Sequence, residues 1–133
     1  MPNRSHKEGL DRILIIDDDL ATLLAIPALI RPYFPNAIIQ TAINGDAALN
    51  WLRDYGYRLI LLDIRLPGID GLTLFNDFRE SFGAAQVIVM TGFVDDKVKA
   101  EALKAGVYAF LEKPVLPKTL IETIEAGLKD SSR

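Results

Sequence analysis

The chain has 133 residues, of which half are apolar and a quarter charged, a composition typical of one folded globular domain rather than a disordered or fibrous protein. Its formal net charge of −3 gives no broad basic surface, so we expect no direct binding of nucleic acid. The absence of cysteine excludes disulfide frameworks and thiol nucleophiles, and no apolar run approaches the ~20 residues that cross a bilayer. We therefore expect a cytoplasmic domain that does not contact a membrane.

A polar leader at residues 1–11 precedes the first apolar run and lacks the pattern of a secretory signal. The one histidine, His6, lies in this leader, where we expect a solvated side chain rather than a catalytic one. The patterned part of the chain runs from residue 12 to residue 129. We expect it to form one domain, followed by a short tail at residues 130–133.

Five short apolar runs predict strands that are buried on both faces, as in a parallel sheet covered by helices. In chain order these runs are Ile13–Ile16, Ala37–Ile39, Leu59–Leu62, Val87–Met90 and Tyr108–Leu111. The segments between them carry apolar residues at helical spacing. This alternation predicts an α/β fold, a flavodoxin-like doubly wound (βα)5 domain with right-handed crossovers. A five-stranded parallel sheet in the order 2-1-3-4-5 is the natural assignment, although alternation alone does not fix the order.

Several helix boundaries are visible in the same pass along the chain. Pro27 falls inside the first helical segment, which should kink there or restart with the proline in its first turn. Asn44-Gly45-Asp46 is typical of a helix start, and Val94-Asp95-Asp96 places acids at the opening of another helix. Ala105-Gly106 predicts a helix end at which glycine provides the left-handed cap.

Polar residues follow four of the five predicted strands. Asp17, Asp18 and Asp19 follow the first, Asp63 follows the third, Thr91 the fourth and Lys113 the fifth. In open α/β sheets ligands bind beyond the carboxyl ends of the strands, near the point where the strand order reverses. Carboxylates gathered there repel one another unless a cation compensates them, and Mg²⁺ accepts such oxygen ligands. We therefore expect a magnesium-filled acidic pocket that can receive a phosphate group, with the lysine opposite.

Each of these signals taken alone has a simpler interpretation. The acidic triplet can be a solvated helix start, Asp63 a turn residue, Thr91 a helix cap and Lys113-Pro114 an ordinary strand exit. The occurrence of all four at the ends of the right strands, in this order, favours a site.

The chain resembles the receiver domains of two-component response regulators, of the chemotaxis-regulator-like kind. The resemblance covers about residues 12–128 and depends on four segments, which are Ile13–Asp19, Leu61–Gly71, Val89–Gly92 and Phe110–Pro114. The stretch from Asp63 to Gly71 is the most specific of them.

The resemblance implies a role for each matching residue. Asp63 is the phosphoacceptor, and Asp17 and Asp18 form the pocket for Mg²⁺, for which Mn²⁺ can substitute. Arg65 contributes its backbone carbonyl to the metal. Gly71, with a second glycine in the same loop, shapes the connection after the third strand.

The resemblance also implies the groups that contact the phosphoryl oxygens. Thr91 donates its hydroxyl, and Lys113 is aimed into the site by a cis peptide bond to Pro114. Thr91 and Phe110 form the switch pair in such domains, although Phe110 is equally well explained as a core residue of the last strand. Asp19 is expected to cap a helix rather than bind the metal.

The function implied is that of a phosphorelay switch. A sensor histidine kinase or a phosphotransfer protein phosphorylates Asp63, and the surface of the fourth helix, fifth strand and fifth helix changes. A downstream output domain or target protein reads that surface, which is also where a homodimer would form. The domain phosphorylates and dephosphorylates itself, and we interpret it as a switch rather than a turnover enzyme.

Three other classes of protein remain open. A phosphatase or phosphotransferase with an aspartate nucleophile typically has a second acid two residues later, where this chain has Arg65. A flavin- or nucleotide-binding module needs a glycine-rich loop after the first strand, where this chain has acids. A catalytically silent, receiver-like interaction domain would not need the acceptor, acids, threonine and lysine that are present.

Overall fold

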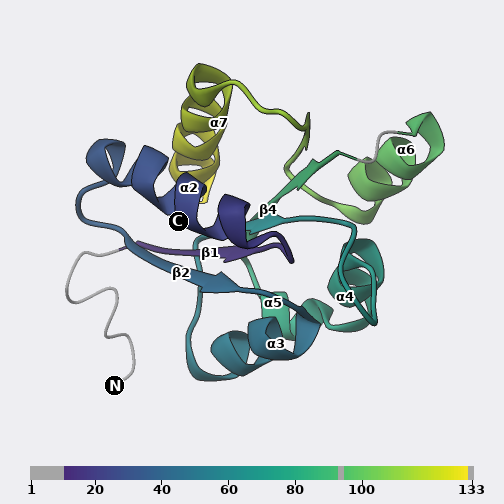
Figure 1. Ribbon diagram of the computed structural model, residues 1–133. Helices are drawn as coiled ribbons and strands as arrows, with labels where there is room; N and C mark the ends of the chain where they lie inside the picture. Colours follow the sequence, from purple (N-terminus) through teal and green to yellow (C-terminus); the bar gives the residue numbers. More distant parts are fainter. Residues whose placement is uncertain (1–10, 93–94, 132–133) are drawn as a thin grey trace.

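Five parallel strands form one sheet in the order β2-β1-β3-β4-β5 (Figure 1). The computed structural model describes residues 11–92 and 95–131, so all of the predicted leader except Asp11 lies outside it. The strands are β1 (Arg12–Ile16), β2 (Ile38–Ala42), β3 (Leu59–Leu62), β4 (Gln86–Thr91) and β5 (Ala109–Glu112). The predicted strand order is confirmed. Because the chain crosses from β2 on one side of β1 to β3 on the other, the topological switch point lies between β1 and β3.

The central strands β1, β3 and β4 are mostly apolar because helices cover both faces of the sheet. Alternate residues of β1 point to opposite faces, so Leu14 and Ile16 enter one hydrophobic cluster while Ile13 and Ile15 enter the other. All residues of β3, the central strand, are buried. This explains why continuous apolar runs, rather than alternating ones, mark these strands in the sequence.

The helices divide between the two faces (Figure 1). α2 and α7 cover one face, and α3, α4, α5 and α6 cover the other. Their bounds are α2 Leu20–Ile30, the 3-10 turn η1 Arg31–Tyr33, α3 Gly45–Asp54, α4 Gly71–Asp77, α5 Arg79–Phe82, α6 Asp96–Ala105 and α7 Pro117–Asp130. No helix in the two described stretches is long and apolar enough to cross a bilayer.

Side-chain caps set the helix starts close to the strand ends. Asp19, Asn44, Asp70 and Asp95 each accept a hydrogen bond from a backbone N–H in the first turn of the helix that follows. The predicted capping role of Asp19 and the predicted start at Asn44 are thereby confirmed. Short connections of this kind hold the strand ends, and the polar residues on them, in fixed positions.

The structure departs from the sequence prediction at two helix boundaries and excludes one of the two outcomes expected at Pro27. The third helical segment is broken at Phe78, whose φ of −122° and ψ of 38° separate α4 from α5. Pro27 is buried inside α2, which continues to Ile30, so the expected restart does not occur and the kink stays a prediction. α7 extends through Asp130, so the first residue of the predicted tail belongs to the helix, while residues 132–133 lie outside the described part.

Candidate functional site

The backbone ladder of the sheet continues into the predicted site residues. The amide of Asp17 donates to the carbonyl of Ala42 at 3.0 Å, and the amide of Asp63 donates to that of Ile16 at 2.9 Å. On the other side, the amide of Lys113 donates to the carbonyl of Thr91 at 2.8 Å. Each residue is therefore fixed at the carboxyl end of its strand by a neighbouring strand, and the predicted positions converge on one edge of the sheet.

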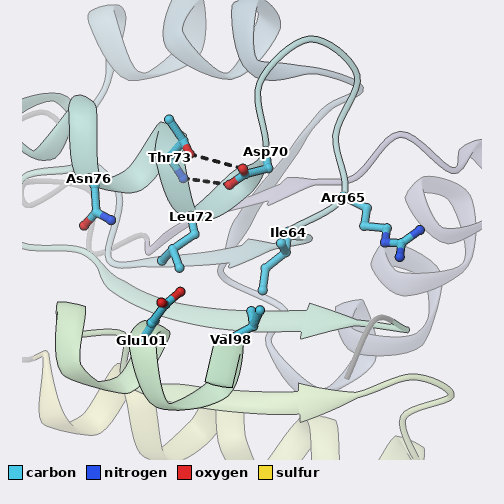
Figure 2. Close-up of a pocket in the computed structure, with 8 residues that line it drawn as sticks. All are labelled: Ile64, Arg65, Asp70, Leu72, Thr73, Asn76, Val98 and Glu101. Atoms are coloured by element: carbon cyan, nitrogen blue, oxygen red, sulfur yellow. Dashed lines mark hydrogen bonds between the residues drawn. The ribbon is translucent and has the colours of Figure 1, made fainter. Parts of the chain in front are cut away.

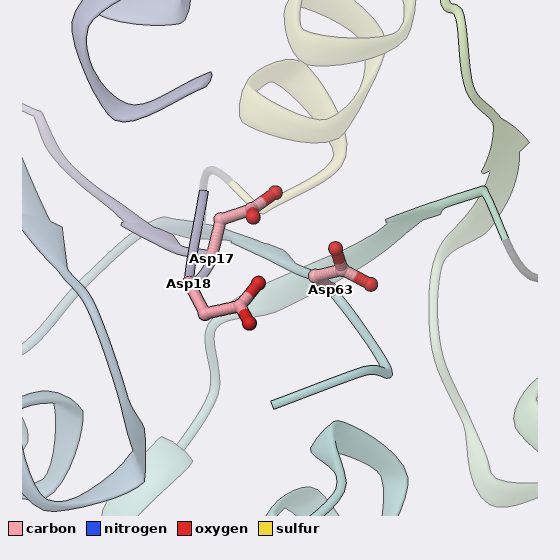
Figure 3. A group of neighbouring side chains, drawn as sticks. All are labelled: Asp17, Asp18 and Asp63. Carbon is pink, nitrogen blue, oxygen red and sulfur yellow. The ribbon is translucent and has the colours of Figure 1, made fainter. Parts of the chain in front are cut away.

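Three carboxyl groups meet at the switch point. Asp17, Asp18 and Asp63 each offer one oxygen, and these atoms lie within 4.8 Å of one another (Figure 3). Asp17 and Asp63 are buried, with 1% and 6% of their surface exposed, whereas Asp18 is open to solvent. Hard oxygen donors around an accessible position are the ligand set that Mg²⁺ prefers, so these residues fit such an ion.

Two local hydrogen bonds orient the buried carboxylates in the same way. Oδ1 of Asp17 accepts from the amide of Asp19 at 2.9 Å, and Oδ1 of Asp63 accepts from the amide of Arg65 at 3.0 Å. These contacts, each to the residue two positions later, are the usual Asx arrangement of a strand end. Their effect here is that Oδ2 of both residues is directed to a shared partner.

The shared partner is Lys113. Its Nζ lies 2.6 Å from Oδ2 of Asp17 and 3.1 Å from Oδ2 of Asp63. The lysine reaches them from the end of β5, across β4, and its peptide bond to Pro114 is cis, as the resemblance implies. The ammonium group of Lys113 thus contacts two of the three carboxylates of the cluster.

The pKa values of the buried groups follow from this arrangement. Burial raises the pKa of the Asp17 carboxyl, and the hydrogen bond from Lys113 opposes that rise without cancelling it. Burial acts to lower the pKa of the Lys113 ammonium, but its contacts with Asp17 and Asp63 outweigh burial and raise it. The contacts of Lys113 therefore favour its ammonium form, whereas burial disfavours the ionised form of Asp17.

The two residues of the predicted switch pair lie at different depths. Thr91 ends β4 and is fully buried. Phe110, in the neighbouring strand β5, is half-buried and packs against the cluster that contains the α6 residue Ala102. This packing agrees with the interpretation of Phe110 as a core residue and leaves its switching role a prediction.

Close packing behind the acceptor loop depends on Gly71. A Cβ atom at this position would lie 2.2 Å from the backbone oxygen of Asp63, and the Gly71 amide donates to the carbonyl of Ile64 at 2.6 Å. The first turn of α4 is therefore pressed against the backbone of the acceptor residue itself.

Sequence reasoning did not single out Asp70 as a functional residue. Its carboxylate accepts from the amide of Thr73 at 2.8 Å and from the hydroxyl of the same residue at 3.1 Å. An Asp followed three positions later by Thr, before an apolar stretch, is the available signal for such a cap.

Comparison with known proteins identifies the family. The sequence profile of the response regulator receiver domain matches residues 13–125, most of the chain. The chain belongs to the response regulator receiver domain family.

The curated relatives of this receiver domain include regulators that are longer than this chain and match it over only part of their length. The transcriptional regulatory protein ZraR of Salmonella typhimurium is 33% identical over 116 residues, which are 87% of this chain and 26% of the relative. ResD of Bacillus subtilis, also a transcriptional regulatory protein, is 31% identical over 92% of this chain and 50% of its own length. The cyclic di-GMP phosphodiesterase response regulator RpfG of Xanthomonas campestris is 32% identical over 81% of this chain and 29% of its own. The chain thus spans between about a quarter and half of these relatives.

Solved structures agree with the family and the fold. A CheY-like receiver domain protein from Methanospirillum hungatei has a TM-score of 0.83 and 30% identity, covering 92% of this chain and 96% of that one. A two-component response regulator from Clostridium difficile has a TM-score of 0.84 and 27% identity, covering 92% and 99%. A receiver domain of a two-component response regulator is a signalling module, and this chain is one.

Proposed function

We propose that this receiver domain is a phosphoacceptor switch in which Asp63 is phosphorylated in a Mg²⁺-dependent reaction. The observation that carries the proposal is the position of the Asp63 carboxylate, which lies beside two further acids and in contact with the ammonium group of Lys113 at the switch point of the sheet. A nucleophilic carboxylate, an oxygen-rich cation pocket and a mobile positive charge are the groups that phosphoryl transfer requires.

The metal would be held by Asp17, Asp18 and Asp63, with the backbone carbonyl of Arg65. When bound, the cation would neutralise charge that develops on the phosphoryl oxygens. The residues fit it because one oxygen from each of three carboxylates lies in the same small space, as a hard divalent cation requires.

In the proposed reaction a carboxylate oxygen of Asp63 forms a bond to the phosphorus of a phosphohistidine or a small acyl phosphate. The bond from phosphorus to the donor breaks, and the donor leaves with the electron pair. Oδ1 of Asp63 accepts from the amide of Arg65 and Oδ2 accepts from Lys113, which supports Oδ2 as the attacking oxygen. Lys113 and the hydroxyl of Thr91 would stabilise the equatorial oxygens. Hydrolysis of the acyl phosphate by water resets the domain.

The proposed donor is a sensor histidine kinase or a phosphotransfer protein, and the proposed readout is the α6–β5–α7 surface. Phosphorylation adds roughly two negative charges and draws hydrogen-bond donors such as the Thr91 hydroxyl toward the site. Phe110 would then move with Thr91, and an output domain, a target protein or a second copy would recognise the changed surface. We place this switch in the cytoplasm and assign it no turnover activity on other substrates.

The test is labelling of the purified chain by acetyl phosphate with and without Mg²⁺, read by intact-mass spectrometry. We expect one phosphoryl group on the wild type with Mg²⁺, none with a chelator, and none on Asp63→Asn. Asp77→Asn, which alters an exposed aspartate of α4, is the matched control and should label normally. Labelling of Asp63→Asn to the wild-type level would refute the assignment, and so would a wild type that never labels.

A further inference from the structure

A groove separates α4 from α6 beside the acceptor loop. It has a volume of about 430 Å³, and Ile64, the residue after the acceptor, lines it together with Leu72 of α4 and Val98 of α6. Figure 2 shows these apolar side chains pointing into the space between the two helices, with Glu101 of α6 facing Leu72. The two helices are therefore not packed against each other along this stretch.

The C-terminal end of α6, in contrast, is bound to the α4 and α5 layer by one arginine. The guanidinium of Arg79 lies over the ring of Phe75, 4.2 Å from its centroid, and its Nη2 donates a hydrogen bond to the carbonyl of Ala105. Phe75 is buried in the core, so the contact connects the end of α6 to a fixed part of the molecule. A cation at the carbonyl end of a helix also suits the helix dipole.

The backbone at this end of α6 is bonded as well. Gly106 adopts the left-handed conformation with φ of 107°, and its amide donates to the carbonyls of Ala102 and Leu103. The amide of Val107 donates to the carbonyl of Ala102 at 3.2 Å. Together with the arginine, these bonds satisfy the carbonyls of Ala102, Leu103 and Ala105 in the last turn and hold it in place.

The N-terminal half of α6 is anchored more weakly. Of the residues that form α6, only Ala102 is buried, and it lies in the C-terminal half. The first turn is capped by its own Asp95, whose carboxylate accepts from the amide of Lys97 at 2.8 Å. Val98, half-buried, borders the groove. Val98 packs against the core cluster and also borders the groove, so the first half of α6 has room to rotate about the bonded last turn.

We propose that Arg79 is a positioning residue that serves as the pivot of α6. Phosphorylation of Asp63 then moves the N-terminal half of α6 across the groove, while the last turn stays bound to Arg79. The groove explains where the displaced half goes, and the arginine explains why the helix tilts instead of detaching. This inference rests on the proposed function, because the phosphoryl group at Asp63 supplies the force.

The experiment is hydrogen–deuterium exchange of the full chain in Mg²⁺, with and without fluoroberyllate as the phosphoryl mimic. In the wild type we expect fluoroberyllate to change exchange at residues 97–101 and to leave Gly106 and Val107 within twofold of their starting rates. In Arg79→Met, which keeps the apolar stem but loses the donor, those two amides should exchange about tenfold faster, the effect expected for one hydrogen bond from a charged donor. They should also now respond to fluoroberyllate.

Two further variants sharpen the result. Arg79→Lys retains a donor and a charge and should restore part of the protection at Gly106. Arg53→Met changes an exposed arginine in the last turn of α3 and should behave as the wild type.

The possible failures are distinguishable. If fluoroberyllate binds but alters Gly106 and Val107 in the wild type as much as it alters residues 97–101, the pivot is refuted. Faster exchange in Arg79→Met with no new response to fluoroberyllate would show a purely structural cap and would equally refute it. If the wild type binds no fluoroberyllate at all, the proposed phosphoacceptor function is refuted. The pivot is then refuted as well, because it depends on that function.

Discussion

Asp17 is the residue at which the needs of the site and of the fold conflict most directly. Its carboxylate is almost fully buried, and burial raises its pKa despite the 2.6 Å contact with Lys113. A charge held in such a place destabilises the native state, since the same group is fully hydrated in the unfolded chain. A cation that binds only the folded protein would offset this destabilisation of the native state.

Replacing the charge should therefore stabilise the domain when no metal is bound. We expect Asp17→Asn, in chelator at pH 7, to raise the free energy of unfolding by about 1 kcal/mol, measured by urea denaturation. With millimolar Mg²⁺ the wild type should gain stability and the variant should gain little. A variant that is less stable than the wild type in chelator would contradict this interpretation.

The pH dependence of the same comparison has a definite sign. The folded-state pKa of Asp17 is raised above 3.8, so the folded protein holds this proton more tightly than the unfolded chain does. The resulting stability is present below pH 3.8 and is lost as the pH rises through the folded pKa. The advantage of Asp17→Asn over the wild type should therefore be smallest in acid and should grow toward pH 7, as urea denaturation at several pH values would show. An advantage that is constant with pH would exclude ionisation of Asp17 as its cause.

At the scale of elements, the connection from β3 to α4 is the most tightly specified part of the site. Asp70 caps α4, and Gly71 lets the first turn of that helix lie against the backbone of Asp63. The conflict that a side chain would create at Gly71 is with a backbone oxygen, which no rotamer change can relieve. The helix therefore fixes where the acceptor carboxylate stands.

A methyl group at this position should disturb both stability and labelling. We expect Gly71→Ala to lose about 2 kcal/mol of unfolding free energy, within the range known for overpacked sites, and to be phosphorylated more slowly by acetyl phosphate. Gly56→Ala is the matched control, because a Cβ there meets nothing within 4 Å, and its stability should change by less than about 0.5 kcal/mol. Wild-type stability and labelling rate in Gly71→Ala would show that the contact is not needed.

At the scale of the whole molecule, the sequence predicts well those features that depend on short sequence patterns, such as apolar runs and the acids that follow them. Apolar runs mark the strands because each strand is covered on both faces, and the acids at Asp17 and Asp63 mark strand ends because parallel strands end at one edge of the sheet. The strand order came from the natural doubly wound assignment and the resemblance rather than from alternation. The convergence of three carboxylates then followed from the order.

The features that the sequence did not predict depend on contacts between distant segments. Nothing in the stretch around Phe78 signals a break, because the turn there is set by how α5 packs in the core. The bond from Arg79 to the carbonyl of Ala105 joins residues 26 positions apart, and an exposed arginine has no sequence signature for such a partner. Pro27 was expected to kink the first helix or to restart it, and α2 runs through the buried proline to Ile30 without restarting.

The most direct test of the account is a crystal structure of the full chain grown with Mg²⁺ and fluoroberyllate. We expect the beryllium on a carboxylate oxygen of Asp63, the magnesium among Asp17, Asp18 and Asp63, and the fluorines in contact with Lys113 and the Thr91 hydroxyl. An unmodified Asp63 in such crystals, with Lys113 still bridging Asp17 and Asp63 and no ion in the acidic pocket, would contradict it.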